Sequence, residues 1–390
     1  MRRVYLDYAA ASPVDPRVME EMLPYFTEKY GNPSSVYSLG FEANSAVEEA
    51  RERVANLIGA EAREIIFTST GTESINLALK GMAQKRKSEG GHVVTSSIEH
   101  PAALSAVDEL ERVGFSVSRL PVDDSAIVDA DTVRDAITGK TILISVMSAN
   151  NEVGAIQPVR EIGDIAREKG IPFHTDAVAA AGKIPIDVTK DNIDLLSLSS
   201  QDLYGPKGVA ALYVRKGTSI VPLLHGGRQE RKLRPGTESV PLIVGMGRAA
   251  EIAAQEMGVE SERLSKMRDQ LVKGLTSTVK ECHLNGRLEK RLPNNANLRL
   301  SYIEGESIVL NLDMKGIQAA TGSACTSETL EPSHVLTAMG IPPEHAHGSI
   351  AFTLGRWTKG DDIDYVIETL PQIVKELRAI SPMVPEGWTD

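Results

Sequence analysis

Residues 194–208, DLLSLSSQDLYGPKG, are the stretch around which the rest of the chain is interpreted. Leu195, Leu196 and Leu198 form an apolar run that predicts a buried strand leading into a turn. The Tyr-Gly-Pro-Lys-Gly sequence at 204–208 is typical of a turn, and VAALYVRKG at 209–217 predicts the next strand. Gln201 and Asp202 therefore follow the first of two neighbouring strands.

Composition restricts the class of protein. The chain has 390 residues, of which 42% are hydrophobic and 24% charged, as in an ordinary soluble enzyme with a large core. Its net charge of −11 opposes non-specific binding to nucleic acid. No apolar run is long enough to cross a membrane, and the first residues lack the apolar core of a signal peptide. The two cysteines form no disulfide framework, so we expect a reducing cytoplasm.

Strands and helices alternate along the first two thirds of the chain. Strands are predicted at 64–69, 91–96, 116–120, 141–147 and 171–175. Helices are predicted at 41–58, from 70 to about 80, at 104–113, at 158–169 and from 240 to about 279. The run at 141–147, TILISVM, is almost wholly apolar, as in a central parallel strand. This alternation predicts an α/β fold with a mostly parallel sheet.

Several polar residues stand where these strands end. Thr70, Gly71 and Thr72 open a helix, so they form either a simple N-cap or an anion site at the helix dipole. Asp176 follows a strand, where carboxylates either bind ligands or cap the next helix. His100 also follows a strand and could be a surface or capping residue. Asn151 could belong to an Asn-Asn turn.

Other candidates lie in loops rich in glycine. Residues 225–231, HGGRQER, and 234–237, RPGT, suggest either an anion-binding loop or a solvated basic turn. Cys325 stands in TGSACTSE at 321–328, where a thiol is accessible, although an incidental loop cysteine is the simpler interpretation. Cys282 is expected to be a small core residue.

Long motifs make the chain resemble the NifS/IscS-type, or group I, cysteine desulfurases. They include GNPSS, TSTGTESINLALKG, NNEVG, the FHxDA…GKxPID pattern, TGSACTSE and LEPSHVL, and the resemblance spans about residues 2 to 383. It implies the fold of PLP-dependent transferases (fold type I), where PLP is pyridoxal phosphate. A large domain is expected at 15–255, and a small α+β domain is expected from 1–14 together with 256–390.

The resemblance also assigns roles by position. Gly71 and Thr72 would hold the PLP phosphate, His100 would stack on the pyridine ring, Asn151 would bond the phenolic oxygen, and Asp176 would pair with the pyridine nitrogen. Ser199 and Gln201 belong to the cofactor-lysine segment and would complete the cofactor contacts. Thr237 would reach the phosphate of the other subunit, which implies a homodimer. Cys325 would take sulfur from L-cysteine as a persulfide.

Four positions depart from the family pattern, and all four lie at cofactor or substrate contacts. Asp202 stands where the family has its Schiff-base lysine, and Gln201 replaces the histidine before it. Ala179 replaces a glutamine, and Ala351 replaces an arginine that binds the substrate. A carboxylate cannot form an imine, so we expect PLP to be weakly held, unattached or absent. Lys207 matches a lysine that active members also have, so it is not assigned the missing role. Arg356 is expected on the opposite side of the strand that carries Ala351.

Three functions remain open from the sequence. In the first, a desulfurase-family protein with impaired turnover serves iron–sulfur cluster assembly. Cys325 is then a persulfide carrier, or a ligand of a [2Fe–2S] cluster shared with a scaffold protein that docks at the Cys325 loop and the tail 377–390. In the second, L-cysteine desulfuration proceeds with non-covalently held PLP and Asp202 as base. In the third, the chain is a PLP-free interaction protein.

Overall fold

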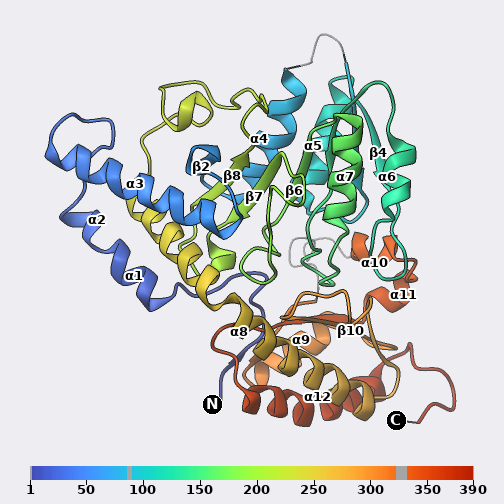
Figure 1. Cartoon of the computed structure of the whole chain (residues 1–390). Helices are drawn as coiled ribbons and strands as arrows, with labels where there is room; N and C mark the ends of the chain where they lie inside the picture. Colours follow the sequence, from blue (N-terminus) through green and yellow to red (C-terminus); the bar gives the residue numbers. More distant parts are fainter. Residues whose placement is uncertain (1, 86–89, 322–331, 390) are drawn as a thin grey trace.

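A computed structural model describes residues 2–85, 90–321 and 332–389. Its centre is a seven-stranded sheet of order β2-β8-β7-β6-β5-β3-β4 (Figure 1). Only β8 runs antiparallel to its neighbours, so the predicted α/β fold with a mostly parallel sheet is confirmed. The strands are β2 (Ile65–Thr68), β3 (His92–Ser96), β4 (Ser116–Leu120), β5 (Thr141–Ser145), β6 (Phe173–Asp176), β7 (Leu195–Ser199) and β8 (Ala210–Val214).

Helices cover both faces of this sheet and bury its apolar side chains. One hydrophobic cluster joins the sheet to α1 (Pro16–Met22), α3 (Ser38–Leu57), α6 (Ala130–Ala136), α7 (Val159–Lys169) and the first half of α8 (Val240–Thr278). A second cluster joins the other face to α4 (Gly71–Gln84) and α5 (Pro101–Arg112). The short α2 (Pro24–Thr27) connects α1 to α3. Strands buried on both faces explain the continuous apolar runs in the sequence.

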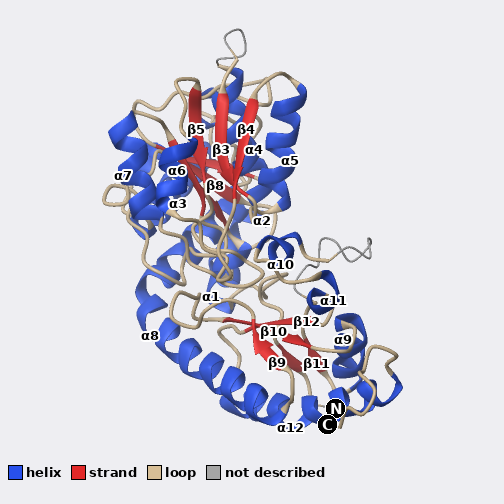
Figure 2. Ribbon diagram, turned by 90° about the vertical axis from the view of Figure 1, so that its right-hand side faces the viewer, coloured by secondary structure: helices blue, strands red, loops and turns tan. Residues whose placement is uncertain are grey.

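The lower part of the molecule contains two small sheets (Figure 2). Strands β9 (Cys282–Leu284), β10 (Asn295–Leu300) and β12 (Ser349–Thr353) form an antiparallel sheet, and β1 (Val4–Tyr5) pairs in parallel with β11 (Ile317–Gln318). Their core packs against the second half of α8, α9 (Gly305–Met314) and α12 (Gly360–Ile380). The two ends of the chain thus meet here, while the domain limits remain a prediction.

The remaining elements are short. Helices α10 (His334–Ala338) and α11 (Pro343–Ala346) follow the 322–331 segment, and 3-10 turns lie at η1 (Ala62–Glu64), η2 (Gln201–Leu203) and η3 (Glu230–Lys232). Most predicted elements agree with the structure to within a few residues. Helix α5 begins at Pro101, three residues before its predicted start, because the Nδ1 atom of His100 accepts the Ala102 N–H at 3.1 Å. Among the described residues, no helix is long and apolar enough to span a membrane.

Candidate active site

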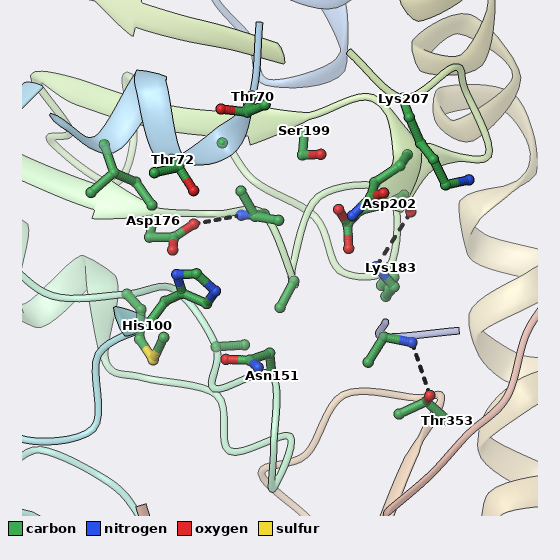
Figure 3. A pocket seen from close by; sticks show the side chains of 18 of the residues that line it. Thr70, Thr72, His100, Asn151, Asp176, Lys183, Ser199, Asp202, Lys207 and Thr353 are labelled. Atoms are coloured by element: carbon green, nitrogen blue, oxygen red, sulfur yellow. Dashed lines mark hydrogen bonds between the residues drawn. The ribbon is translucent and has the colours of Figure 1, made fainter. Parts of the chain in front are cut away.

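A cavity of about 380 Å³ lies where the carboxyl ends of the central strands meet the first turn of α4. Figure 3 shows polar side chains from several elements pointing into it. Eight residues predicted from the sequence line this cavity, namely Gly71, Thr72, His100, Asn151, Asp176, Ser199, Gln201 and Asp202. The fold therefore brings together, from five separate segments of the chain, eight of the residues that the motifs single out.

The first turn of α4 forms the upper wall. The Thr70 side chain accepts the Glu73 N–H at 3.1 Å, which confirms the N-cap interpretation. A Cβ atom added to Gly71 would lie 3.1 Å from Cγ2 of Val178, so a glycine lets the turn approach the loop after β6 closely. Because Gly71 and Thr72 line the cavity, the positive end of the α4 dipole faces it, and an anion would be stabilised there.

Asp176 places a carboxylate at the inner wall. It is the last residue of β6 and is buried, and its Oδ1 accepts the Val178 N–H at 2.9 Å. Burial raises the pKa of Asp176 to about 6, and the hydrogen bond from Val178 opposes this shift. The carboxylate caps the turn that follows, and as a cavity-lining residue it is also available to a ligand.

His100 lines the same cavity as Asp176, and Figure 3 draws its ring on the same side of the view as the Asp176 carboxylate. Burial lowers the pKa of His100, so its imidazole is neutral near pH 7. Because Nδ1 accepts the Ala102 N–H, the proton of the neutral ring is assigned to Nε2. The capping interpretation of His100 is therefore confirmed, while stacking on a ligand remains a prediction.

Glu99, which the sequence-based prediction does not include, lies buried behind His100. Its Oε1 accepts hydrogen bonds from Ser96 Oγ at 2.5 Å and from the Met147 N–H at 3.0 Å. Burial raises the pKa of Glu99 to about 8, helped by the nearby Asp176. No spacing in the sequence points to Glu99, because its burial and its hydrogen bond from the Met147 N–H depend on how the segments that follow β3 and β5 pack together.

Asp202 stands in the η2 turn directly after β7. Burial raises the pKa of Asp202 to about 6, and the charge of Lys183 opposes this shift. Its Oδ2 atom is buried, and no hydrogen-bond partner for it occurs among the described residues. A buried oxygen without a partner on a cavity wall indicates that a ligand or a proton completes this site.

Lys183 is a cavity residue that the sequence-based prediction does not include. It lines the same cavity, and its Nζ lies 3.4 Å from the main-chain oxygen of Asp202, to which it donates. Burial lowers the pKa of Lys183, while the carboxylate of Asp202 opposes this effect. The one signal for it in the sequence is its place in the GKxPID part of the quoted motif.

The mouth of the cavity is built from the N-terminal segment. Ser12 Oγ donates to the main-chain oxygen of Gln201, and Lys207 Nζ donates to the Ser12 oxygen at 3.0 Å. The Ala9 N–H donates to Thr353 Oγ1 at 2.9 Å, which ties this segment to β12. Residues far apart in the chain thus close one side of the cavity.

Some predicted residues lie elsewhere. Thr237 is exposed and does not line the cavity of its own chain, and Cys325 lies outside the described residues. Arg356 is not on a strand as expected, because β12 ends at Thr353 and the chain then turns. Its guanidinium donates to Asp15 and pairs with Glu256 at 2.9 Å. Within the described part of the chain, no group of three or more His, Cys, Asp or Glu residues could hold a metal ion.

Comparisons with known proteins agree with this fold. The model of the class-V aminotransferase family matches residues 4–366. The "Cysteine desulfurase IscS" of Methanosarcina thermophila is 54% identical over 99% of this chain and 96% of its own length. A solved structure described as "NIFS-LIKE PROTEIN" superposes with a TM-score of 0.91 at 39% identity, covering 96% of this chain and all of its own. Another, "SspA in complex with cysteine", has a TM-score of 0.81 at 38% identity and covers 90% of this chain and 98% of its own.

Proposed function

The chain belongs to the class-V aminotransferase family, and from that premise we propose that it is a cysteine-desulfurase-family protein of iron–sulfur cluster assembly. It binds PLP in the cavity, its substrate class is L-cysteine, and its intrinsic desulfuration is impaired. Cys325 serves as a persulfide carrier, or as a ligand of a [2Fe–2S] cluster shared with a scaffold protein. The observation that carries the proposal is the carboxylate of Asp202 on the wall of an otherwise well-formed cofactor cavity.

The residues of the cavity fit PLP. The positive end of α4 at Gly71 and Thr72 suits its phosphate, and the buried carboxylate of Asp176 suits its pyridine nitrogen. The neutral imidazole of His100 on the cavity wall offers a flat surface for the ring, and Asn151 supplies an amide. PLP, when bound, supplies an electron sink for reaction at the α-carbon of an amino acid. The protein residues would hold and orient the cofactor, and the Asp176 carboxylate would balance the positive charge of a protonated pyridine nitrogen.

Impaired turnover follows from the four departures from the family pattern. Asp202 supplies no amine at the position of the family's Schiff-base lysine, and Ala179 and Ala351 remove one cofactor contact and one substrate contact. Each lost interaction costs on the order of 2–4 kcal/mol of transition-state stabilisation, so desulfuration falls by many powers of ten.

A homodimer is supported by the surface formed by residues 19–41. This segment, from α1 to the start of α3, carries large exposed apolar side chains, and Phe41 is 73% exposed in the single chain. They are Met19, Leu23, Phe26, Tyr30, Val36, Tyr37 and Phe41. So many exposed apolar residues in one segment are typical of a surface that a protein covers. With such a dimer, the exposed Thr237 is free to serve the cavity of the partner.

One specific observation favours a second candidate function. Burial raises the pKa of Asp202 to about 6, close to the value that suits a general base near neutral pH. In this alternative, PLP held without a covalent bond supports L-cysteine desulfuration, and Asp202 moves the α-proton.

The deciding experiment uses the full chain with added PLP. Cofactor binding is followed by visible absorbance and equilibrium dialysis, and turnover by sulfide release from L-cysteine with a thiol reductant. The proposal expects bound PLP and little sulfide. Robust sulfide release that Asp202→Asn abolishes would favour the second candidate, and release unchanged by Asp202→Asn would remove Asp202 from the mechanism. Absence of PLP binding would favour a bridging protein without cofactor.

A further inference from the structure

Two of the lysines that the structure describes line the cavity, and their environments differ. Lys207 is exposed, and its Nζ is engaged by the main-chain oxygen of Ser12 at 3.0 Å. Lys183 is half-buried, and its Nζ approaches the main-chain oxygen of Asp202 at 3.4 Å, beyond the usual length of a strong hydrogen bond. Both lysines belong to motifs of the resembled family, so the sequence favours neither of them, and by geometry Lys183 is the less firmly engaged of the two amines.

The backbone around Lys183 is fixed on both sides. Gly182 has a φ of +69°, and a Cβ atom there would lie 2.6 Å from Cδ2 of Leu203 in the η2 turn. Only a glycine fits both this conformation and this close contact. On the other side, Ser261 Oγ of α8 donates to the main-chain oxygen of Lys183 at 2.6 Å. The turn is thus held between η2 and α8, which directs the lysine side chain to the turn that carries Asp202.

The electrostatics at Lys183 favour reactivity. Burial lowers the pKa of Lys183, which increases the fraction of free amine, the form that attacks carbonyl carbon. The neighbouring carboxylate of Asp202 keeps this effect moderate and can hold or return a proton. Lys207 receives no comparable burial, because its side chain is exposed.

We propose that Lys183 is the amine through which this chain holds the aldehyde of PLP. The free Nζ attacks the aldehyde carbon, a carbon–nitrogen double bond replaces the carbon–oxygen double bond, and the oxygen leaves as water after taking up two protons. The amine supplies these protons, and Asp202 is placed to relay one of them. The proposal rests on the proposed function in one respect, that PLP enters the cavity. It revises the expectation that the cofactor remains unattached.

The test traps the bond chemically. The full-length protein is incubated with PLP, reduced with borohydride, digested and mapped by mass spectrometry. We expect the pyridoxyl adduct at Lys183. The amount of adduct should fall at least about tenfold in Lys183→Arg, which keeps the positive charge but cannot form the bond. The matched variant Lys207→Arg should retain the adduct. Circular dichroism of both variants shows that they are folded.

Equilibrium dialysis of PLP, measured in parallel, separates the two proposals. If PLP binds and no reduction-stable adduct appears at Lys183, the covalent assignment is wrong and the proposed function is unaffected. An adduct at Lys207 or elsewhere also overturns the assignment. If PLP does not bind at all, both the covalent assignment to Lys183 and the cofactor part of the proposed function are wrong.

Discussion

Arg51 and Glu230 form a buried ion pair in which two guanidinium N–H groups donate to the two carboxylate oxygens at 2.7 and 2.8 Å. Glu230 also accepts the Phe67 N–H of β2 at 2.8 Å. Glu230, Arg231 and Lys232 have φ values of +43°, +54° and +67°, a conformation that side chains other than glycine adopt at a cost. The ion pair thus fixes a strained turn just before the loop that carries Thr237.

Glu230→Gln should destabilise the protein markedly. It removes the buried carboxylate that pairs with Arg51 and leaves this guanidinium its ion pair with the exposed Glu48, so we expect the free energy of unfolding to fall by roughly 3 kcal/mol. Glu42→Gln, which breaks the exposed pair with Lys29 at 3.0 Å, serves as control and should have a much smaller effect. Urea denaturation of both variants measures the difference. Equal losses would mean that the buried pair does not hold the turn.

Asp202→Lys should restore what the family pattern supplies at this position. An amine at the end of β7 offers the single aldehyde of PLP an alternative lysine to Lys183, at the family's own position, so we expect tighter cofactor retention and a rise in sulfide release of at least about tenfold. Activity should stay below that of a complete site, because Ala179 and Ala351 are unchanged. Asp202→Asn is the matched control, since it removes the charge without adding an amine. If Asp202→Lys and Asp202→Asn behave alike, position 202 is not what limits turnover.

The sequence predicts eight of the residues that line this cavity, but it misses Lys183, which also lines it, and Glu99, which is buried next to His100 in the chain. Thr72, Asp176 and Asn151 could be predicted because local motifs follow predicted strands, and parallel strands bring their carboxyl ends to one edge. Lys183 and Glu99 could not, because their importance arises from tertiary contacts. Lys183 gains its role from the packing of Gly182 against Leu203, and Glu99 from its hydrogen bond with the Met147 N–H. Arg356 was misplaced because the end of β12 depends on its register with β10.

The two cysteines should differ sharply in reactivity. Cys282 lies in the core beside β10, and burial raises the pKa of its thiol to about 12. At about pH 8 its thiolate fraction is on the order of 10⁻⁴, so iodoacetamide should spare it in the native protein. Labelling is measured by mass spectrometry. We expect Cys325→Ser to abolish rapid labelling of the protein, and Cys282→Ala to leave rapid labelling unchanged. Rapid labelling of Cys282 would contradict its assignment to the core.

Glu99→Gln should change how stability depends on pH. Burial raises the pKa of Glu99 from its ordinary value of 4.5 to about 8 in the folded protein, so between these two pH values the folded form holds a proton that the unfolded form releases. The stability from this difference is present below pH 4.5 and is lost as pH rises through about 8. Glutamine cannot ionise, so between about pH 6 and about pH 9 the variant should gain on the order of 2 kcal/mol relative to the parent protein.

Urea denaturation at the two pH values measures this gain, with Glu109→Gln on the exposed side of α5 as the control for a surface carboxylate. Asp176 is the titratable neighbour that acts on Glu99, so Asp176→Asn in the same background tests the coupling. Removing the Asp176 charge should lower the pKa of Glu99 and shrink the gain, because a like charge no longer opposes ionisation. A gain that is the same for Glu99→Gln and Glu109→Gln would show that Glu99 ionises freely in the fold, and that the wall behind His100 is not the buried environment described above.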